Sequence, residues 1–236
     1  MRIHLLPAAL AASIVLVALS GCAGVGIDSP TPSAEETASS TPTPSPEPAR
    51  PALDELVLTP QGIADVVLGA PVPAGDPALQ PYVWDPTACG TPEISEGDPY
   101  AGYWHSFETG TPGPYGNPRA FVFTTDGGVQ DGSVLAVHVW NTVRTAEGIG
   151  PGSTRAELEA AYPGITVQSG VDGYSDVYEV VEVADRIVFE VADDAAQGGG
   201  YWEPGVNETV LWMWAEPAIG APHGIAATDA GAPCMF

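Results

Sequence analysis

Residues 53–236 contain the same series of motifs twice, in the same order. The similarity joins three segments of one half with three of the other: 62–69 with 148–152, 119–128 with 185–194, and 133–140 with 209–216. Repetition of several motifs in a fixed order indicates two copies of one structural unit. We therefore predict one globular unit over 53–236, built from a first repeat at 53–144 and a second repeat at 145–236.

The second repeat begins with a segment typical of a short helix, STRAELEAAYPG at 153–164. Thr154 is suited to cap its start, and Glu157, three residues later, completes a capping box. Pro163 and Gly164 end the helix. Alternating apolar residues then predict three strands, at 176–183, 186–191 and 209–215.

The first repeat has a weaker version of the same pattern. Its helix is expected near residues 73–80, and its strands at 102–107, 119–124 and 133–141. DGG at 126–128 is typical of a hairpin turn. The expected fold class is therefore α+β: two tandem repeats, each a short helical segment plus about three antiparallel strands, with the sheet covered by helices on one face.

Two short segments carry a family resemblance: Leu68-Gly69-Ala70 in the first half and Gly152-Ser153-Thr154-Arg155 in the second. They resemble the Gly-Met-Thr-Arg start of each helix in β-lactamase inhibitor proteins and in SmpA/BamE-like lipoproteins. Neither copy has the methionine, and the first lacks the Thr-Arg as well. The resemblance implies a tandem helix-plus-sheet architecture, and it bears on fold more than on activity.

The N-terminus has the pattern of a bacterial secretion signal. Arg2 precedes an apolar run over residues 5–19, which is shorter than the roughly 20 residues of a membrane-spanning helix. The run ends in Leu-Ser-Gly-Cys at 19–22, which resembles the lipobox of bacterial lipoproteins. The resemblance implies that residues 1–21 are a signal peptide that is removed. It also implies that the Cys22 sulfur carries a lipid with acyl chains such as palmitate, which anchor a protein firmly to a membrane.

An ordinary secreted protein, cut near Ala18 or Ala23, is the alternative to an anchored one. Residues 28–51 favour the anchor, because Pro, Ser and Thr dominate them and no apolar residue larger than alanine appears. Such a segment buries too little surface to fold and is suited to a tether. We therefore predict a lipidated Cys22 and a disordered tether over 22–52. The folded unit is expected at the cell membrane of a bacterium, facing outside the cytoplasm.

The chain is strongly acidic, with 30 acidic residues against 6 basic ones, all of which are arginine. Its formal net charge of −24 argues against a nucleic-acid partner, because such binding needs a basic patch to displace counterions. Anionic lipid surfaces should repel it too, so we expect the lipid alone to hold it at the membrane. The acidic surface serves solubility or attracts a basic partner, and both interpretations stay open.

The sequence contains three cysteines. If Cys22 is lipidated, Cys89 and Cys234 remain as a pair in an oxidising compartment. We predict one disulfide between them, which would close a loop of roughly 145 residues and contribute about 5 kcal/mol in the chain-entropy model. Metal binding by two cysteines so far apart, without matching histidine spacing, is disfavoured.

The sequence has no catalytic signature, so we expect a protein that is not an enzyme and that holds no cofactor or metal. It contains no Gly-x-Ser-x-Gly motif and no lysine. His105 and Ser106 are neighbours on a predicted strand, so their side chains point to opposite faces. The acidic segment 126–131 does not have the spacing of an EF-hand. Carboxylate pairs such as Glu203 and Glu208 are too common in this chain to be informative.

Alternation in two matching strands gathers aromatic side chains on one face of the expected sheet. The candidate binding residues are His138, Trp140, Trp212 and Trp214, with Trp104 and Tyr103 nearby. Exposed tryptophans mark interaction sites, whereas most tryptophans in strands belong to a core. The burial of these rings therefore decides between the two interpretations.

The leading hypothesis is a membrane-anchored extracytoplasmic lipoprotein whose non-enzymatic domain binds a protein or an envelope glycan through the Trp-bearing sheet face. Charge complementarity favours a basic or neutral partner. One alternative is a cell-wall carbohydrate-binding or glycan-remodelling module, with rings stacked on sugars and a carboxylate pair for acid–base chemistry. A role like that of β-lactamase inhibitor proteins is a third possibility, which the resemblance alone suggests.

Overall fold

The computed structural model describes residues 48–89, 102–109, 119–169 and 173–221. The predicted signal peptide, Cys22, most of the tether and Cys234 lie outside these ranges, so what the sequence predicts for them stays a prediction. All described residues fall within one unit, Pro46–Phe236. Within the described ranges, no helix is long and apolar enough to cross a membrane.

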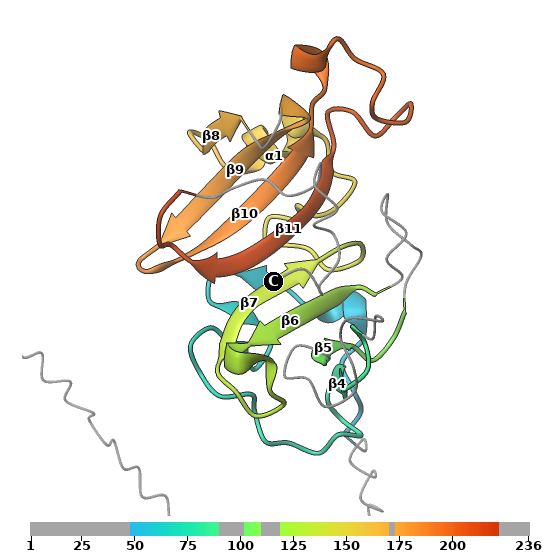
Figure 1. Cartoon of the computed structure of the whole chain (residues 1–236), viewed down its shortest axis with the longest axis vertical. Helices are drawn as coiled ribbons and strands as arrows, with labels where there is room; N and C mark the ends of the chain where they lie inside the picture. Colours follow the sequence, from blue (N-terminus) through green and yellow to red (C-terminus); the bar gives the residue numbers. More distant parts are fainter. Residues whose placement is uncertain (1–47, 90–101, 110–118, 170–172, 222–236) are drawn as a thin grey trace, which may run out of the picture. The chain divides into compact units, whose positions relative to one another are not determined.

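Antiparallel strands make up most of the described structure, and eight of them form one large sheet (Figure 1). These strands are β4 (Tyr82–Asp85), β5 (Tyr103–Ser106), β6 (Phe121–Thr125), β7 (Val134–Val139), β8 (Thr166–Ser169), β9 (Ser175–Glu182), β10 (Asp185–Ala192) and β11 (Val210–Pro217). Their order across the sheet is β4-β5-β6-β7-β11-β10-β9-β8. A small three-stranded sheet contains β1 (Leu58–Thr59), β2 (Gly62–Ile63) and β3 (Val66–Val67).

The predicted α+β fold class, with helices covering the sheet, is wrong. Among the described residues the only α-helix is α1 (Arg155–Ala161), and the remaining helical segments are short 3-10 turns at Leu53–Glu55, Asp126–Gly128 and Ala195–Gln197. The helix expected near 73–80 is absent. Pro73 and Pro77 explain this, because proline lacks the backbone N–H of a helical turn and clashes with the preceding turn.

Helix α1 forms where the sequence predicts it, and its first turn is closed by side chains. The backbone N–H of Glu157 donates to the Thr154 hydroxyl at 3.2 Å, and the backbone N–H of Thr154 donates to the Glu157 carboxylate at 2.8 Å. This reciprocal capping box satisfies two backbone donors that a helix end leaves open. Leu158 points from α1 into the core and is fully buried.

The large sheet consists of two consecutive runs of strands that meet at their last members. Strands β4 to β7 follow one another in the chain, as do β8 to β11, and β7 pairs antiparallel with β11. Two of the three pairs of matching segments occupy corresponding strands: 119–128 includes β6, 185–194 includes β10, 133–140 includes β7, and 209–216 includes most of β11. The third pair does not, because 62–69 contains β2 and β3 whereas 148–152 contains no strand. Among the described residues, the helix occurs in the second run alone.

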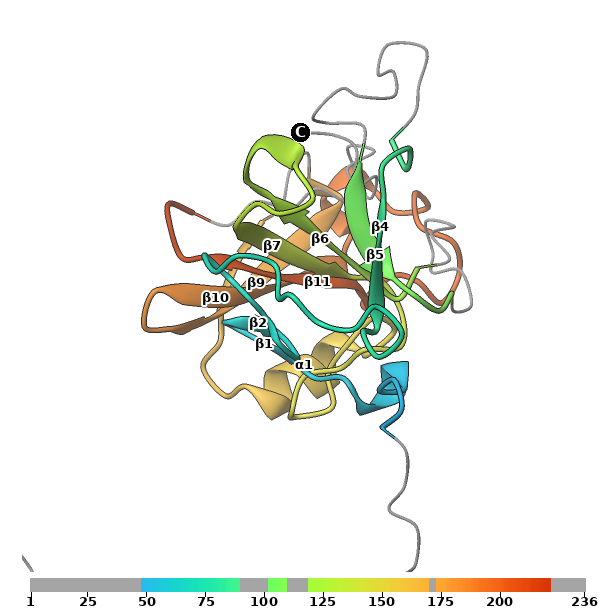
Figure 2. The same cartoon turned by 90° about the horizontal axis from the view of Figure 1, so that it is seen from below.

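One face of the large sheet is covered by α1, the small sheet and the turn at Leu53–Glu55 (Figure 2). Leu58 and Ile63 from the small sheet and Leu158 from α1 pack in one cluster with sheet residues such as Phe123 and Phe189. The small sheet thus takes the position on this face that a first-repeat helix was expected to take. Burial of this apolar surface is the main favourable contribution to the fold.

Candidate functional site

The side chains of the large sheet that point away from α1 form a continuous aromatic surface, which we call the tryptophan face. The register places Val122, His138 and Trp214 opposite one another across β6, β7 and β11. Trp140 and Trp212 lie beside them, with ring centroids 5.9 Å apart. The structure thus brings together the four side chains that alternation in the sequence predicts to share a face.

The three tryptophans of this face are core side chains. Trp140 and Trp214 are 2% exposed, and Trp212 is 1% exposed. The imidazole of His138 stacks between two of them, at 5.9 Å and 28° from Trp140 and at 6.2 Å and 21° from Trp214. An interaction surface made of these rings would need them uncovered, so of the two interpretations of the tryptophans, burial favours the core.

The aromatic surroundings determine the ionisation of His138. Burial removes water from around the imidazole and lowers the pKa of His138 from 6.5 to about 4. At neutral pH the ring is therefore uncharged and packs as one more aromatic side chain.

A buried carboxylate fixes one of the indoles. Glu190 is fully buried, and it accepts hydrogen bonds from the Trp212 indole N–H at 2.7 Å and from the Ser175 hydroxyl at 2.5 Å. These two donors compensate part of the cost of placing a polar group away from water. The Trp140 indole N–H, by contrast, is buried with no hydrogen-bond partner. The indole N–H of Trp212 thus contributes a hydrogen bond to the fold, whereas that of Trp140 contributes none.

The structure separates Trp104 from the other predicted binding residues. Its ring stacks on Phe123 at 5.5 Å and 7°, on the face covered by α1, and its N–H donates to the Gln130 carbonyl at 3.0 Å. Tyr103, its neighbour on β5, joins the cluster of the tryptophan face, where the Arg119 guanidinium lies 4.8 Å from the ring. Adjacent residues of a strand point to opposite faces of the sheet, so Trp104 and Tyr103 cannot belong to one binding surface.

His105 lies near an aspartate but not near a nucleophile. Its Nε2 is 3.8 Å from the Asp85 carboxylate, which is also 3.7 Å from Arg119. Burial alone would raise the pKa of Asp85, but hydrogen bonds from Thr87 and the charges of His105 and Arg119 outweigh it and lower that pKa. The Ser106 hydroxyl donates to the Glu108 carbonyl and accepts from the Ala120 N–H. The hydroxyl is thus engaged away from the imidazole.

Each arginine in the described part of the chain already has a partner. Arg50 donates to a carbonyl and stacks on Phe107, and Arg144 donates to Ser153. Arg155 binds the carboxylates of Asp176, Asp193 and Glu208, whereas Arg186 binds those of Glu179 and Glu216, and Arg119 lies beside Asp85. The sequence contains no lysine, so the surface charges of the described residues that these arginines leave unpaired are carboxylates.

The large sheet has a gap in its edge next to the end of α1. Strand β9 pairs with β10 over its whole length, but with the edge strand β8 only at residues 176–179. Residues 180–182 of β9 therefore have no strand partner on the β8 side in the described structure. Beside them lies a cavity of about 440 Å³, which we call the edge notch.

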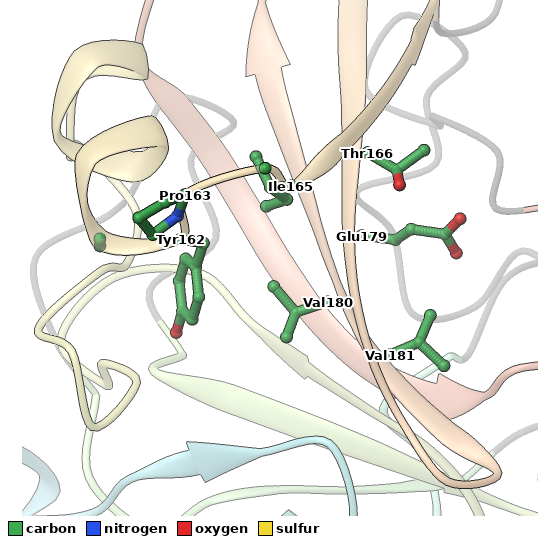
Figure 3. A pocket seen from close by; sticks show the side chains of 9 residues that line it. Tyr162, Pro163, Ile165, Thr166, Glu179, Val180 and Val181 are labelled. Carbon is green, nitrogen blue, oxygen red and sulfur yellow. The ribbon is translucent and has the colours of Figure 1, made fainter.

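The edge notch is lined by the end of α1, the following turn and the two outer strands (Figure 3). Its residues are Ala161, Tyr162, Pro163, Gly164, Ile165, Thr166, Glu179, Val180 and Val181. Val180 points to the side of Tyr162, whereas Glu179 and Val181 point to the opposite side of the strand. Val181 is 52% exposed, and Val167, which lies on β8 but does not line the notch, is 50% exposed. The notch thus combines an exposed apolar side chain, Val181, with unpaired backbone.

The edge notch lies outside the sequence-based predictions, which place a strand at 176–183 but none at 166–169. The pairing of a short strand with a long one is therefore found only in the structure. The alternation in Thr166-Val167-Gln168-Ser169, directly after the Pro163-Gly164 helix stop, was the available signal.

Cys89 belongs to the buried cluster of the tryptophan face, at 2% exposed, and is not a free thiol. Cys234 lies outside the described residues, so its pairing with Cys89 stays a prediction. In the described part of the chain, no group of three or more His, Cys, Asp or Glu side chains is arranged to hold a metal ion. No protein-family model, curated protein or solved structure matches this chain.

Proposed function

We propose that this protein is a bacterial lipoprotein anchored outside the cytoplasm by Cys22, and that its folded unit is a non-enzymatic binding module with the edge notch as its binding site. The lipobox-like Leu-Ser-Gly-Cys at 19–22 and the Pro-, Ser- and Thr-rich segment after it support the anchor and the tether. A tethered domain of this kind is placed to meet partners in the cell envelope.

The observation that best supports this binding site is the solvent exposure of an apolar side chain that lines the notch. Val181, which lines the notch, leaves about half of its surface in water, while the tryptophans at the sheet centre leave almost none. Apolar side chains beside a cavity and an unpaired strand edge are features of sites that bind protein segments.

The carbohydrate-binding alternative has less support, because a sugar ring needs an open aromatic face and Trp140, Trp212 and Trp214 are covered. The inhibitor alternative stays a prediction that rests on the sequence resemblance alone.

Two experiments test the proposal in cells. Replacing Cys22 with alanine should move the protein from the membrane fraction to the medium, and mass spectrometry of the wild-type N-terminus should find a lipid on that cysteine. A membrane-bound Cys22→Ala variant would contradict the anchor.

The binding site is tested with a photo-crosslinking amino acid at Val181. The same amino acid at Leu135 is the control, because Leu135 is 48% exposed on β7, well away from the notch in the strand order. We expect an adduct with one envelope protein from position 181 and none from position 135. Equal adducts at both positions, or none at either, would overturn the notch as the binding site.

A further inference from the structure

The unpaired part of β9 exposes backbone groups that a further strand can pair with. Alternate residues of an antiparallel strand direct both their N–H and their C=O to the same side, so residues 180–182 present such groups toward the missing partner. Sheet edges of this type are templates for strand addition by extended peptides. The backbone pattern therefore selects an extended occupant over a helical one.

The side chains around the notch provide apolar contacts on both sides of the added strand. Tyr162, Ile165 and Val180 pack against the core on the side of α1, while Val181 is open on the other side. An extended peptide directs successive side chains to opposite faces, so it can place one apolar side chain on each side of the sheet.

The charge around the notch is negative. Glu179 lines it, and Glu182 and Asp185 follow at the end of the β9–β10 hairpin. The nearest cation, Arg186, is 3% exposed and is already shared between Glu179 and Glu216. The rim therefore favours a segment that carries positive charge.

This charge also argues against two occupants from the same protein. The tether carries Asp28, Glu35, Glu36 and Glu47 against a single arginine, Arg50, which is already held by a carbonyl and by Phe107. A second copy of the chain would bring a further formal charge of −24. Like charges disfavour both, whereas a basic segment of a different molecule complements this rim.

We propose that the edge notch binds an extended basic segment of a partner protein by strand addition to β9. This inference rests on the proposed binding function and specifies its mode and the chemistry of the ligand. The added strand pairs with residues 180–182 in line with β8, and its Arg or Lys side chains meet Glu179, Glu182 and Asp185.

The test uses the full mature chain in detergent and three synthetic peptides, with affinities measured by fluorescence anisotropy. The first repeats Arg-Arg-Val-Val, so that each face of the extended peptide carries both residue types. The second has glutamate in place of arginine, and the third is the first with alternate backbone nitrogens methylated. Methylation keeps the charge and removes the strand-pairing donors. We expect the basic peptide to bind at least tenfold more tightly than either of the others. Its affinity should also fall as salt is raised, because salt screens the charge contribution.

Variants locate the binding. Val181→Arg adds a repelling charge at the notch and should weaken binding of the basic peptide at least tenfold, whereas Leu135→Arg, which adds the same charge on β7, should leave it within twofold. Equal loss in both variants would mean that net charge alone attracts the peptide. Equal affinity for the methylated peptide would mean that no strand is added.

The outcome also separates this inference from the function on which it rests. If position 181 crosslinks to an envelope protein in cells but the basic peptide does not bind, the notch is a binding site and the basic strand is wrong. If neither occurs, both proposals fall.

Discussion

Apolar side chains are buried at the centre of the large sheet, but some are half exposed at its β8–β9 edge. At the centre, where β7 meets β11, the tryptophans are at most 2% exposed, and Glu190 and His138 are packed among them. At the β8–β9 edge, Val181 and Val167 are about half exposed, and residues 180–182 of β9 have no strand partner on the β8 side among the described residues. The tryptophans are therefore buried at the centre of this sheet, whereas some aliphatic side chains stay exposed at this edge.

The largest effect should come from Cys89, which is buried in the cluster of the tryptophan face. Cys89→Ser, or reduction of the protein, removes the predicted bond to Cys234 and should lower the free energy of unfolding by as much as about 5 kcal/mol, because the bond would close a long loop. Urea unfolding with and without reductant measures the loss. Mass spectrometry of an unreduced digest identifies the partner, and a Cys89 peptide joined to anything but Cys234 would contradict the pairing.

Truncation of a central tryptophan should cost almost as much. Trp212→Ala or Trp214→Ala leaves a cavity in a close-packed cluster and should destabilise the protein by about 3–5 kcal/mol. Val167→Ala at the edge should cost less than about 0.5 kcal/mol, because half of that side chain is already in water. Thermal melts followed by circular dichroism compare the three. Near-wild-type melting of the tryptophan variants would mean that the rings are not core.

Acid should weaken the centre through His138. The unfolded imidazole has a pKa of 6.5 and the folded one a pKa of about 4, so unfolding takes up a proton between these values. Stability is complete above pH 6.5 and falls as the pH drops toward 4, by as much as about 3 kcal/mol, because each pKa unit corresponds to about 1.4 kcal/mol. Urea unfolding at several pH values measures this slope.

The matched control is His138→Gln, which replaces the imidazole with an amide that does not ionise in this pH range. Carboxylates also titrate near pH 4, so the difference between the two proteins isolates the histidine. Identical slopes in the wild type and the variant would show that His138 is not responsible.

The two buried indole N–H groups allow a finer comparison within the centre. Trp212→Phe removes a donor from the buried Glu190 and should cost about 1–3 kcal/mol beyond the lost ring area. Trp140→Phe removes an N–H that has no partner and should cost less. Urea unfolding of both variants gives the difference, and a larger loss for Trp140→Phe would contradict the role of Glu190.

The sequence predicts the centre better than it predicts the fold class. Alternation correctly places His138 and Trp140 on one face and predicts the side on which Trp212 and Trp214 lie, because the period of a strand is a local property. The capping box of Thr154 and Glu157 is predicted for the same reason. The burial of the tryptophan face depends on which distant parts of the chain pack over it, and a local sequence pattern does not predict this packing.

The predicted fold class is wrong because a repeat in sequence does not repeat every element of the structure. The strand motifs do recur in corresponding strands, but the first run has prolines where the second has a helix, and the small sheet covers the face instead. The edge notch was missed because it arises from the different lengths of β8 and β9. Strand length at an edge is set by tertiary packing, which alternation cannot predict.

The smallest effect is expected at the edge itself, from two neighbouring valines. Val181 is 52% exposed, so Val181→Arg should change the free energy of unfolding by less than about 0.5 kcal/mol. Val180 is partly buried and packs against the core under α1, so Val180→Arg should cost more than about 1 kcal/mol, because its charge would be forced against apolar neighbours. Urea unfolding of both variants measures the contrast. If the two variants lose stability equally, the edge is packed like the centre, and the distinction between a closed core and an open binding edge disappears.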